Sequence, residues 1–321
     1  MKIKVLIIGG SGQIGFYLSK LLVNKNIDVY ISTRNPKAKK LYKFKNKING
    51  KINILKLNIY NKENVTYHLK KIKPNYIFYL AGQSSVHQSF YKKKETFVSN
   101  YVGCKNILDS IVDNKLNHKF FNAASTEMFG NKKNKIKITT NKNPVSPYGQ
   151  SKLKSFNLLK NYRKKFYLKV YNGILSNCES FIRPENFILP KICISAIKAK
   201  KNLEEGKIVK FEFGNINIKR DWGWAEEYAE SIWNKMQKKE YDFFVATGKS
   251  FYLKELIILA FGKLNLNWKN HITISKKFLR KKEISSVEIN LSKKQKKMKL
   301  NGRDIILKLL KHYSKKNLSF T

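Results

Sequence analysis

The sequence predicts an α/β protein in which a doubly wound parallel sheet is followed by a smaller α/β region. Over residues 1–175, short runs rich in β-branched side chains alternate with amphipathic stretches, which is typical of βαβ units. After Asn172 the alternation breaks down, and proline and glycine interrupt a less regular region. We therefore expect a first domain over residues 1–175 and a second region over residues 176–321, some segments of which return to the sheet.

The expected elements follow from the same periodicities. Strands are expected where short apolar or alternating runs occur, at residues 2–8, 28–32, 52–57, 76–80, 119–123 and 168–172. Helices are expected where apolar side chains recur every three or four positions, at residues 13–25, 61–72, 93–115, 147–165, 186–202, 225–238 and 252–264. Ligands of such a sheet bind beyond the carboxyl ends of its strands, so we look for functional residues there.

Composition narrows the class of protein. Of the 321 residues, 42% are hydrophobic, which is enough to bury a core and excludes overall disorder. Lys and Arg outnumber Asp and Glu by 66 to 21, but the excess is spread along the chain without a confined basic block. We interpret it as a bias toward lysine and expect no nucleic-acid partner. No apolar run is long enough for a membrane span or a signal peptide, so we expect no membrane partner.

Cysteine and histidine usage points away from disulfides and metals. The three cysteines, Cys104, Cys178 and Cys193, are an odd number without a Cys-x-x-Cys pair, and the five histidines show no ligand spacing. We therefore expect no metal site, and a reducing compartment such as the cytoplasm.

A glycine-rich turn lies where the first strand meets the first helix. Glycine lets the backbone turn sharply and approach a pyrophosphate, and the N–H groups at a helix N-terminus attract the anion. The turn predicts a dinucleotide site in a Rossmann-like domain. Its cofactor-binding candidates are Gly9, Ser11, Gly12, Gln13, Ile14 and Gly15.

The end of the second strand indicates which dinucleotide is bound. An Asp or Glu there would hold the ribose 2′-hydroxyl of NAD, but the strand runs into Arg34. A guanidinium pairs with a 2′-phosphate through two parallel hydrogen bonds, so we expect NADP. The alternative is an exposed Arg34 without a phosphate partner, since cations are abundant in this chain.

Tyr148 and Lys152 are the first catalytic candidates. They lie four residues apart, on one face of a helix that Ser146 can cap and Pro147 can begin. A nearby ammonium favours the tyrosinate and lowers the pKa of the phenol, as a base that removes a hydroxyl proton requires. The same spacing occurs in two other pairs, Tyr67 with Lys71 and Tyr101 with Lys105. Only the first pair begins a helix that follows a strand end.

Ser125 and Glu127 lie at the end of the strand that precedes this helix. On an extended chain their side chains point to the same side, so one hydroxyl and one carboxylate can face one substrate. We expect Ser125 to share a hydrogen bond with the oxygen being oxidised and Glu127 to transfer a proton. The alternative for both is an ordinary turn or surface residue.

These motifs together resemble the extended short-chain dehydrogenases/reductases. Within that family the chain is most similar to the nucleotide-sugar 4,6-dehydratases, and among these to the branch that acts on GDP-mannose. The segments that carry the resemblance are residues 9–15, 80–84 (LAGQS), 123–130, 146–152, 171–180 (YNGILSNCES) and 220–223 (RDWG). The last two are the specific ones, because the glycines and the Tyr-Lys spacing indicate only the superfamily.

The resemblance implies an internal redox cycle on a GDP-sugar. Hydride leaves C4 of the sugar for NADP, water is lost across C5–C6, and the same hydride returns to C6. Tyr148 is then the base for the C4 hydroxyl, and Lys152 tunes it and holds the nicotinamide ribose. Glu127 takes the C5 proton and helps the C6 hydroxyl leave. The product would feed deoxyhexose synthesis.

Further binding residues and an assembly are implied by matching positions. For the cofactor these residues are Asn58, Leu80, Ala81 and Gln83. For the substrate they are Ser84, Asn177, Glu179, Arg183, Lys191, Arg220, Arg280 and Glu283. The resemblance also implies a homo-oligomer, either a dimer or a tetramer.

Several positions depart from the family pattern and leave the base and sugar of the substrate open. The departures are Ile14 and Asn58 in place of Asp, Ser85 and Cys178 in place of His, and Leu189-Pro190 in place of Thr-Arg. One alternative is a related NADP-dependent nucleotide-sugar epimerase or reductase, which Glu127 argues against. The other is a cofactor-binding regulatory or RNA-associated protein without turnover, which the joint presence of the four catalytic candidates argues against.

Overall fold

The computed structural model describes residues 2–33, 35–36, 46–292 and 298–316. The chain forms two compact units. Unit 1 comprises residues 1–130, 138–175 and 225–245, and unit 2 comprises residues 131–137, 176–224 and 246–321.

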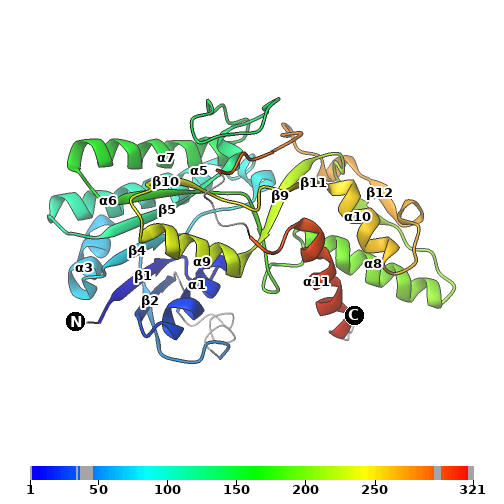
Figure 1. Cartoon of the computed structure of the whole chain (residues 1–321), viewed down its shortest axis with the longest axis horizontal. Helices are drawn as coiled ribbons and strands as arrows, with labels where there is room; N and C mark the ends of the chain where they lie inside the picture. Colours follow the sequence, from blue (N-terminus) through cyan, green and yellow to red (C-terminus); the bar gives the residue numbers. More distant parts are fainter. Residues whose placement is uncertain (1, 34, 37–45, 293–297, 317–321) are drawn as a thin grey trace. The chain divides into compact units, whose positions relative to one another are not determined.

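Unit 1 is built on a seven-stranded parallel sheet (Figure 1). In spatial order its strands are β10 (Asp242–Val245), β6 (Val170–Leu175), β5 (Lys119–Ser125), β4 (Tyr76–Tyr79), β1 (Lys4–Ile8), β2 (Asp28–Thr33) and β3 (Ile52–Lys56). Every neighbouring pair is parallel, as expected of a doubly wound sheet. The strand order reverses between β1 and β4, which makes their carboxyl ends the topological switch point where such sheets bind ligands.

The six expected strands all form, with one clear shift in position. β6 was expected to end at Asn172 but continues through Gly173 to Leu175. Glycine usually weakens a strand interior. Here it makes room for a neighbour, because a Cβ on Gly173 would lie 2.5 Å from Cε2 of Phe121 on β5. The glycine therefore marks a close approach of an aromatic ring rather than a strand end.

The helices of unit 1 cover this sheet. They are α1 (Gln13–Asn24), α3 (Lys62–Ile72), α4 (Val86–Ser89), α5 (Lys93–Phe97), α6 (Gly103–Asp113), α7 (Pro147–Phe166) and α9 (Ala225–Met236), with a short 3-10 turn, η2 (Thr126–Met128). Apolar side chains of α3, α6 and α7 share one core with Leu6 and Ile8 of β1, while α1 packs against α9. The expected helix over 93–115 is divided by a π-helical turn, η1 (Val98–Val102).

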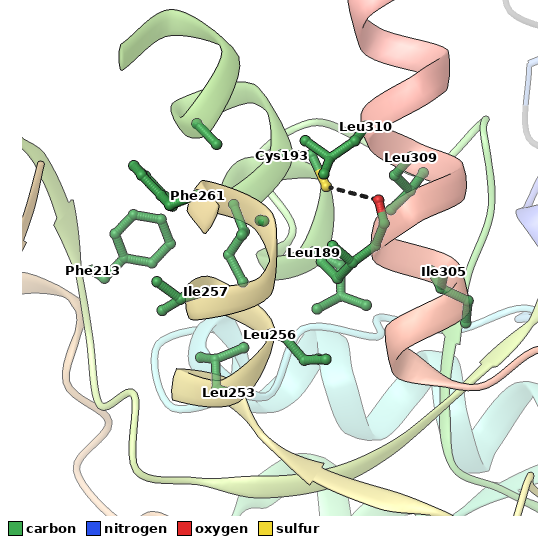
Figure 2. Packing of buried hydrophobic residues seen from close by; sticks show 14 of the residues in the cluster. Leu189, Cys193, Phe213, Leu253, Leu256, Ile257, Phe261, Ile305, Leu309 and Leu310 are labelled. Carbon is green, nitrogen blue, oxygen red and sulfur yellow. Dashed lines mark hydrogen bonds between the residues drawn. The ribbon is translucent and has the colours of Figure 1, made fainter. Parts of the chain in front are cut away.

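Unit 2 is a smaller α/β arrangement. It contains a three-stranded sheet of β11 (Ser250–Tyr252), β9 (Lys219–Trp224) and β7 (Asn177–Glu179), and a pair of β12 (Ile272–Ile274) with β8 (Phe211–Phe213). Its helical elements are α8 (Ile188–Glu204), α10 (Leu253–Gly262), α11 (Gly302–Lys315), η3 (Trp268–Asn270) and η4 (Lys276–Phe278). Figure 2 shows the apolar core that α8, α10 and α11 share, in which Cys193 Sγ donates to the Ile306 carbonyl at 3.7 Å.

The three cysteines are buried free thiols. Within the described ranges, no helix has the length and apolar character needed to cross a bilayer. In the same ranges, no three His, Cys, Asp or Glu side chains are placed to hold a metal ion.

Candidate active site

The glycine turn joins β1 to α1 in unit 1. Gly9 has a φ of 83°, and a Cβ there would lie 2.6 Å from the Ala81 nitrogen. A Cβ on Gly15 would lie 2.7 Å from the Gly10 Cα, so these glycines permit close backbone packing. At Gly12 the nearest atom to such a Cβ is the Gly9 carbonyl oxygen, at 3.4 Å, and no side chain caps α1. The space before the helix and its first N–H groups therefore fit a pyrophosphate.

The loop after β4 carries Leu80, Ala81, Gln83 and Ser84, and the π-helical turn holds it in place. The Gln83 amide donates to Ser99 Oγ (3.1 Å), and Asn100 Nδ2 donates to the Gln83 carbonyl (3.1 Å). A Cβ on Gly82 would lie 2.2 Å from Asn100 Oδ1. Sequence analysis did not single out Ser99 or Asn100, because a π-helical turn inside a helical pattern leaves no separate signal.

Two other cofactor candidates follow β2 and β3. Arg34 lies outside the described residues, one position beyond the end of β2 at Thr33. Asn58 follows β3, and its Oδ1 accepts a hydrogen bond from the Tyr60 amide at 3.1 Å. This side chain therefore supports a turn between β3 and α3.

Ser125 ends β5, but the expectation of an extended chain through Glu127 is wrong. Ser125 Oγ accepts a hydrogen bond from the Glu127 amide at 3.2 Å, so the serine caps the turn η2 and the chain bends at once. A Cβ on Gly149 would lie 2.6 Å from the Glu127 carbonyl oxygen. The structure thus brings the Glu127 backbone against the first turn of α7, which carries Tyr148.

The start of α7 is formed as the sequence predicts. Ser146 Oγ accepts a hydrogen bond from the Gly149 amide at 3.1 Å, and Pro147 is the first helical residue. Lys152 Nζ lies 5.7 Å from the centre of the Tyr148 ring. It donates to the Ala123 carbonyl of β5 at 2.9 Å. The base candidate and its ammonium partner are therefore brought together and tied to the strand that ends in Ser125.

Lys152 is a buried cation. The residue is only 7% exposed. Burial lowers the pKa of Lys152 from 10.5 to about 8, while the nearby Cys104 acts in the opposite direction. A fraction of the ammonium groups therefore loses its proton close to neutral pH.

In unit 2, two of the substrate candidates, Arg220 and Arg280, converge on the carboxylate of a third, Glu283. Glu283 Oε1 accepts from Arg280 Nη1 at 2.8 Å and lies 3.3 Å from Nη2 of the buried Arg220. Arg220 also donates to the Ile284 carbonyl at 2.6 Å. A hollow of about 240 Å³, called here the unit-2 pocket, is lined by Asn215, Ile216, Asn217, Ile274, Leu279, Arg280 and Glu283.

The other substrate candidates of unit 2 have different neighbours. Glu179, on β7 beside Asn177, is buried, and Arg183 Nε lies 3.9 Å from its Oε2. Burial raises the pKa of Glu179 to about 7, against the lowering effect of Arg183. Lys191 Nζ donates to the Glu212 carbonyl at 2.5 Å. It also lies over two aromatic rings, those of Phe213 (4.7 Å) and Phe278 (4.1 Å).

Asp221 is a residue of unit 2 to which sequence analysis assigned no role. Its fully buried carboxylate accepts four hydrogen bonds, from Ser176 Oγ (3.1 Å), Thr247 N (3.1 Å), Thr247 Oγ1 (2.9 Å) and Gly248 N (2.7 Å). Burial raises its pKa and these bonds lower it, with burial prevailing. Asp221 therefore ties β9 to the turn at Thr247. Its place within Arg-Asp-Trp-Gly was the signal that could have found it.

Comparisons with known proteins identify the family of the chain. The family model described as GDP-mannose 4,6 dehydratase matches residues 6–303. GDP-mannose 4,6 dehydratase 1 of Arabidopsis thaliana is 33% identical over 302 residues, which cover 90% of this chain and 82% of the relative. GDP-mannose 4,6 dehydratase of Homo sapiens is 30% identical over 327 residues, covering 93% of this chain and 87% of the relative.

Solved structures share the fold. A dTDP-glucose 4,6-dehydratase from Bacillus anthracis, in complex with NAD, superposes with a TM-score of 0.81 at 17% identity and covers 99% of this chain and 98% of its own. A UDP-glucose 4-epimerase from Thermotoga maritima, with UDP-glucose, has a TM-score of 0.81 at 18% identity, covering 98% of this chain and 99% of its own. These likenesses confirm the expected doubly wound parallel sheet.

Proposed function

This chain belongs to the GDP-mannose 4,6-dehydratase family, and from that membership we propose that it converts GDP-mannose to GDP-4-keto-6-deoxymannose by loss of water. One observation carries the proposal beyond family membership. In unit 1, the Glu127 backbone packs against the first turn of α7, which carries Tyr148, and its amide donates to Ser125 Oγ, so the sequence puts a carboxylate at this point of the site. Oxidation alone needs a base such as Tyr148, whereas loss of water also needs a carboxylate that can remove one proton and donate another.

The glycine turn fits a nicotinamide dinucleotide, and we assign NADP to it. The geometry at Gly9, Gly12 and Gly15 supports the pyrophosphate site, and Arg34 in the sequence favours the 2′-phosphate. When bound, NADP supplies the hydride acceptor and donor of the reaction. The assigned residues are Gly9, Ser11, Gly12, Gln13, Ile14, Gly15, Arg34, Asn58, Leu80, Ala81, Gln83, Tyr148 and Lys152.

The chain's own side chains handle the protons. Tyr148 removes the proton of the C4 hydroxyl, and the buried ammonium of Lys152 favours the tyrosinate that does so. Ser125 hydrogen-bonds the C4 oxygen. Once C4 is a ketone the C5 proton is acidic, so Glu127 takes it and returns a proton to the leaving C6 hydroxyl. The released oxygen then departs as water, which leaves a C5–C6 double bond. When C6 receives the hydride, the proton that Tyr148 removed from the C4 hydroxyl is returned to C5, so the base is regenerated.

We place the nucleotide part of the substrate in unit 2 and the dinucleotide in unit 1. The convergence of Arg220, Arg280 and Glu283 beside the unit-2 pocket supports a site for phosphate and ribose. The remaining substrate candidates are Ser84, Asn177, Glu179, Arg183 and Lys191. The family resemblance supports a homo-oligomer, a dimer or a tetramer, and the three free thiols support a reducing compartment such as the cytoplasm.

The test is to incubate the purified protein with GDP-mannose without added reductant and to follow the sugar nucleotide by mass spectrometry. We expect loss of one water with no net change in NADPH. Loss of water only from another sugar nucleotide would move the substrate and keep the reaction. Consumption of NADPH would indicate a reductase, and inversion of a hydroxyl without a mass change would indicate an epimerase.

Two variants separate the steps of the reaction. Glu127→Gln should bind the cofactor but lower the rate of water loss by roughly 100-fold or more. Tyr148→Phe should lower the rate of the first oxidation by a similar factor. Glu63→Gln, the same change at an exposed position of α3, serves as the control and should retain full activity. Normal water loss by Glu127→Gln would show that its assigned role is wrong.

A further inference from the structure

A lysine-rich segment and a segment that follows two lysines run side by side in unit 2. Residues 131–137 lie beside residues 284–290, with a parallel bridge between Ile136 and Ile289, and the second segment follows directly after Lys281, Lys282 and Glu283. The Ile136 amide donates to a carbonyl of the second segment at 2.7 Å, and the Asn290 amide donates back to the Ile136 carbonyl at 2.9 Å. These backbone bonds fix the two segments as a pair.

Asn131 extends this pairing to the edge of the unit-2 pocket. Its Nδ2 donates to the carbonyl of Glu283, which lines the pocket, at 3.2 Å. Its Oδ1 accepts from the Ser285 amide at 2.8 Å. The lysine-rich segment 131–137 is therefore hydrogen-bonded at its start to Glu283, a residue that lines the pocket.

Folding thus gathers a basic surface that does not stand out as one block in the sequence. We call it the basic rim, and it consists of Lys132, Lys133, Lys135, Lys137, Lys281 and Lys282. All but the first of these are exposed. The two carboxylates of the same segments are paired with other cations, Glu283 with Arg220 and Arg280, and Glu288 with Lys219 at 3.0 Å. Over residues 131–137 and 280–290 the six rim lysines and Arg280 outnumber the two carboxylates, so the rim carries a local excess of positive charge.

Two lysines of the basic rim lie next to the unit-2 pocket in the chain. Lys281 and Lys282 lie in the chain between Arg280 and Glu283, which both line the pocket. Asn215 and Asn217 add polar groups to the lining, while Ile216, Ile274 and Leu279 make it partly apolar. A hollow with polar and apolar walls and a cationic border suits a nucleotide, whose phosphates are anionic and whose base is flat and apolar on its faces.

We propose that the basic rim captures the diphosphate of the sugar nucleotide and guides it to the unit-2 pocket. This inference rests on the proposed function for the identity of the ligand. The net charge of +45 alone does not explain such capture. At physiological ionic strength charges act over about 8 Å, so only lysines near the pocket contribute. A local cluster of this kind raises association rates and leaves dissociation nearly unchanged.

The test compares two pairs of adjacent exposed lysines. One variant carries Lys281→Gln with Lys282→Gln, and the control carries Lys70→Gln with Lys71→Gln at the end of α3, so both lose the same charge. Association and dissociation of GDP bearing a fluorescent group on its ribose are measured by stopped-flow fluorescence at several sodium chloride concentrations. At low salt the rim variant should associate roughly threefold more slowly, with a shallower dependence on salt. The control should match the unmodified protein.

Other outcomes would overturn the inference. An equal decrease in both variants would assign the effect to bulk charge, and no decrease in either would remove any steering role. A single-stranded RNA that bound more tightly than GDP, and lost that binding in the rim variant, would assign the rim to nucleic acid. GDP binding requires no turnover, so protein that captures GDP but leaves GDP-mannose unchanged would refute the proposed function and keep this inference. Protein that dehydrates GDP-mannose, but whose rim variant associates with GDP at the unmodified rate, would refute this inference and keep the proposed function.

Discussion

Lys152 combines the charge that we propose to activate Tyr148 with a cost in stability. Its ammonium is buried, hydrogen-bonded to the Ala123 carbonyl and close to the Tyr148 ring. The spacing of Tyr148 and Lys152 in the sequence predicts their proximity. It does not predict the burial, which depends on strands and helices brought together from distant parts of the chain.

The pKa of Lys152 leads to a prediction about stability. The pKa is 10.5 in the unfolded chain and about 8 in the folded chain, so below about pH 8 folding must bury a charged group. As the pH rises from about 8 to 10.5, the folded chain loses this proton first, and the free energy of unfolding rises. At neutral pH, Lys152→Met should therefore have a free energy of unfolding, measured by urea titration, that is about 2–3 kcal/mol higher than that of the unmodified protein. This difference should disappear by about pH 10.5.

Lys164→Met provides the control for this measurement. Lys164 is exposed on the same helix, so the substitution adds a similar apolar side chain without removing a buried charge. Its unfolding should differ little from that of the unmodified protein over the same pH range. An advantage of Lys152→Met that did not depend on pH would contradict the assigned cause.

The candidate site was predictable to different degrees at the residue scale. Sequence analysis selected Ser125, Glu127 and the Tyr148 helix because their residue types and spacing carry chemistry. The bend after Ser125 was missed because the choice between an extended strand end and a capped turn depends on whether the serine hydroxyl finds the Glu127 amide. Asn100 was missed because its role arises only where the π-helical turn meets the loop after β4.

At the scale of elements, long periodic segments were predictable and short ones were not. The six expected strands and seven expected helices are close to those observed, because their patterns extend over several residues. The missed strands β7, β8 and β10 have three or four residues, which is too short to show a period, whereas the equally short β4 was found from its wholly apolar run. α11 was missed although its signals are present, namely Asn301 with Asp304 at its start and apolar residues at helical spacing.

The start of α11 gives a prediction for this element. Asn301 Oδ1 accepts from the Arg303 amide at 3.1 Å, and Asp304 Oδ2 accepts from the Asn301 amide at 3.0 Å, which completes a capping box. Asn301→Ala should lower the free energy of unfolding by about 1 kcal/mol, because a donor at the helix start loses its acceptor. Asn301→Ser, which keeps an acceptor, should stay within a few tenths of a kcal/mol in the same urea titration. Equal losses in both variants would show that the cap does not stabilise α11.

At the scale of the whole molecule, the net charge of +45 opposes folding. The compact state brings the cations closer together than the unfolded chain does, so their repulsion costs stability. Sodium chloride screens this repulsion. Raising its concentration from low millimolar to about 0.5 M should therefore increase the free energy of unfolding, measured by urea titration. Sulfate is avoided because it strengthens apolar burial in any protein. A constant or falling free energy would show that the charges are already compensated.

The order in which the chain builds unit 1 has a consequence for its synthesis. The last strand of the sheet, β10, and the helix that packs on α1, α9, come from residues 225–245, after the chain has passed through residues 176–224 of unit 2. A chain emerging from the ribosome therefore exposes the edge of β6, a strand that is wholly buried in the finished protein, until β10 has been made. During that interval the unpaired backbone groups of β6 are open to pairing with another chain.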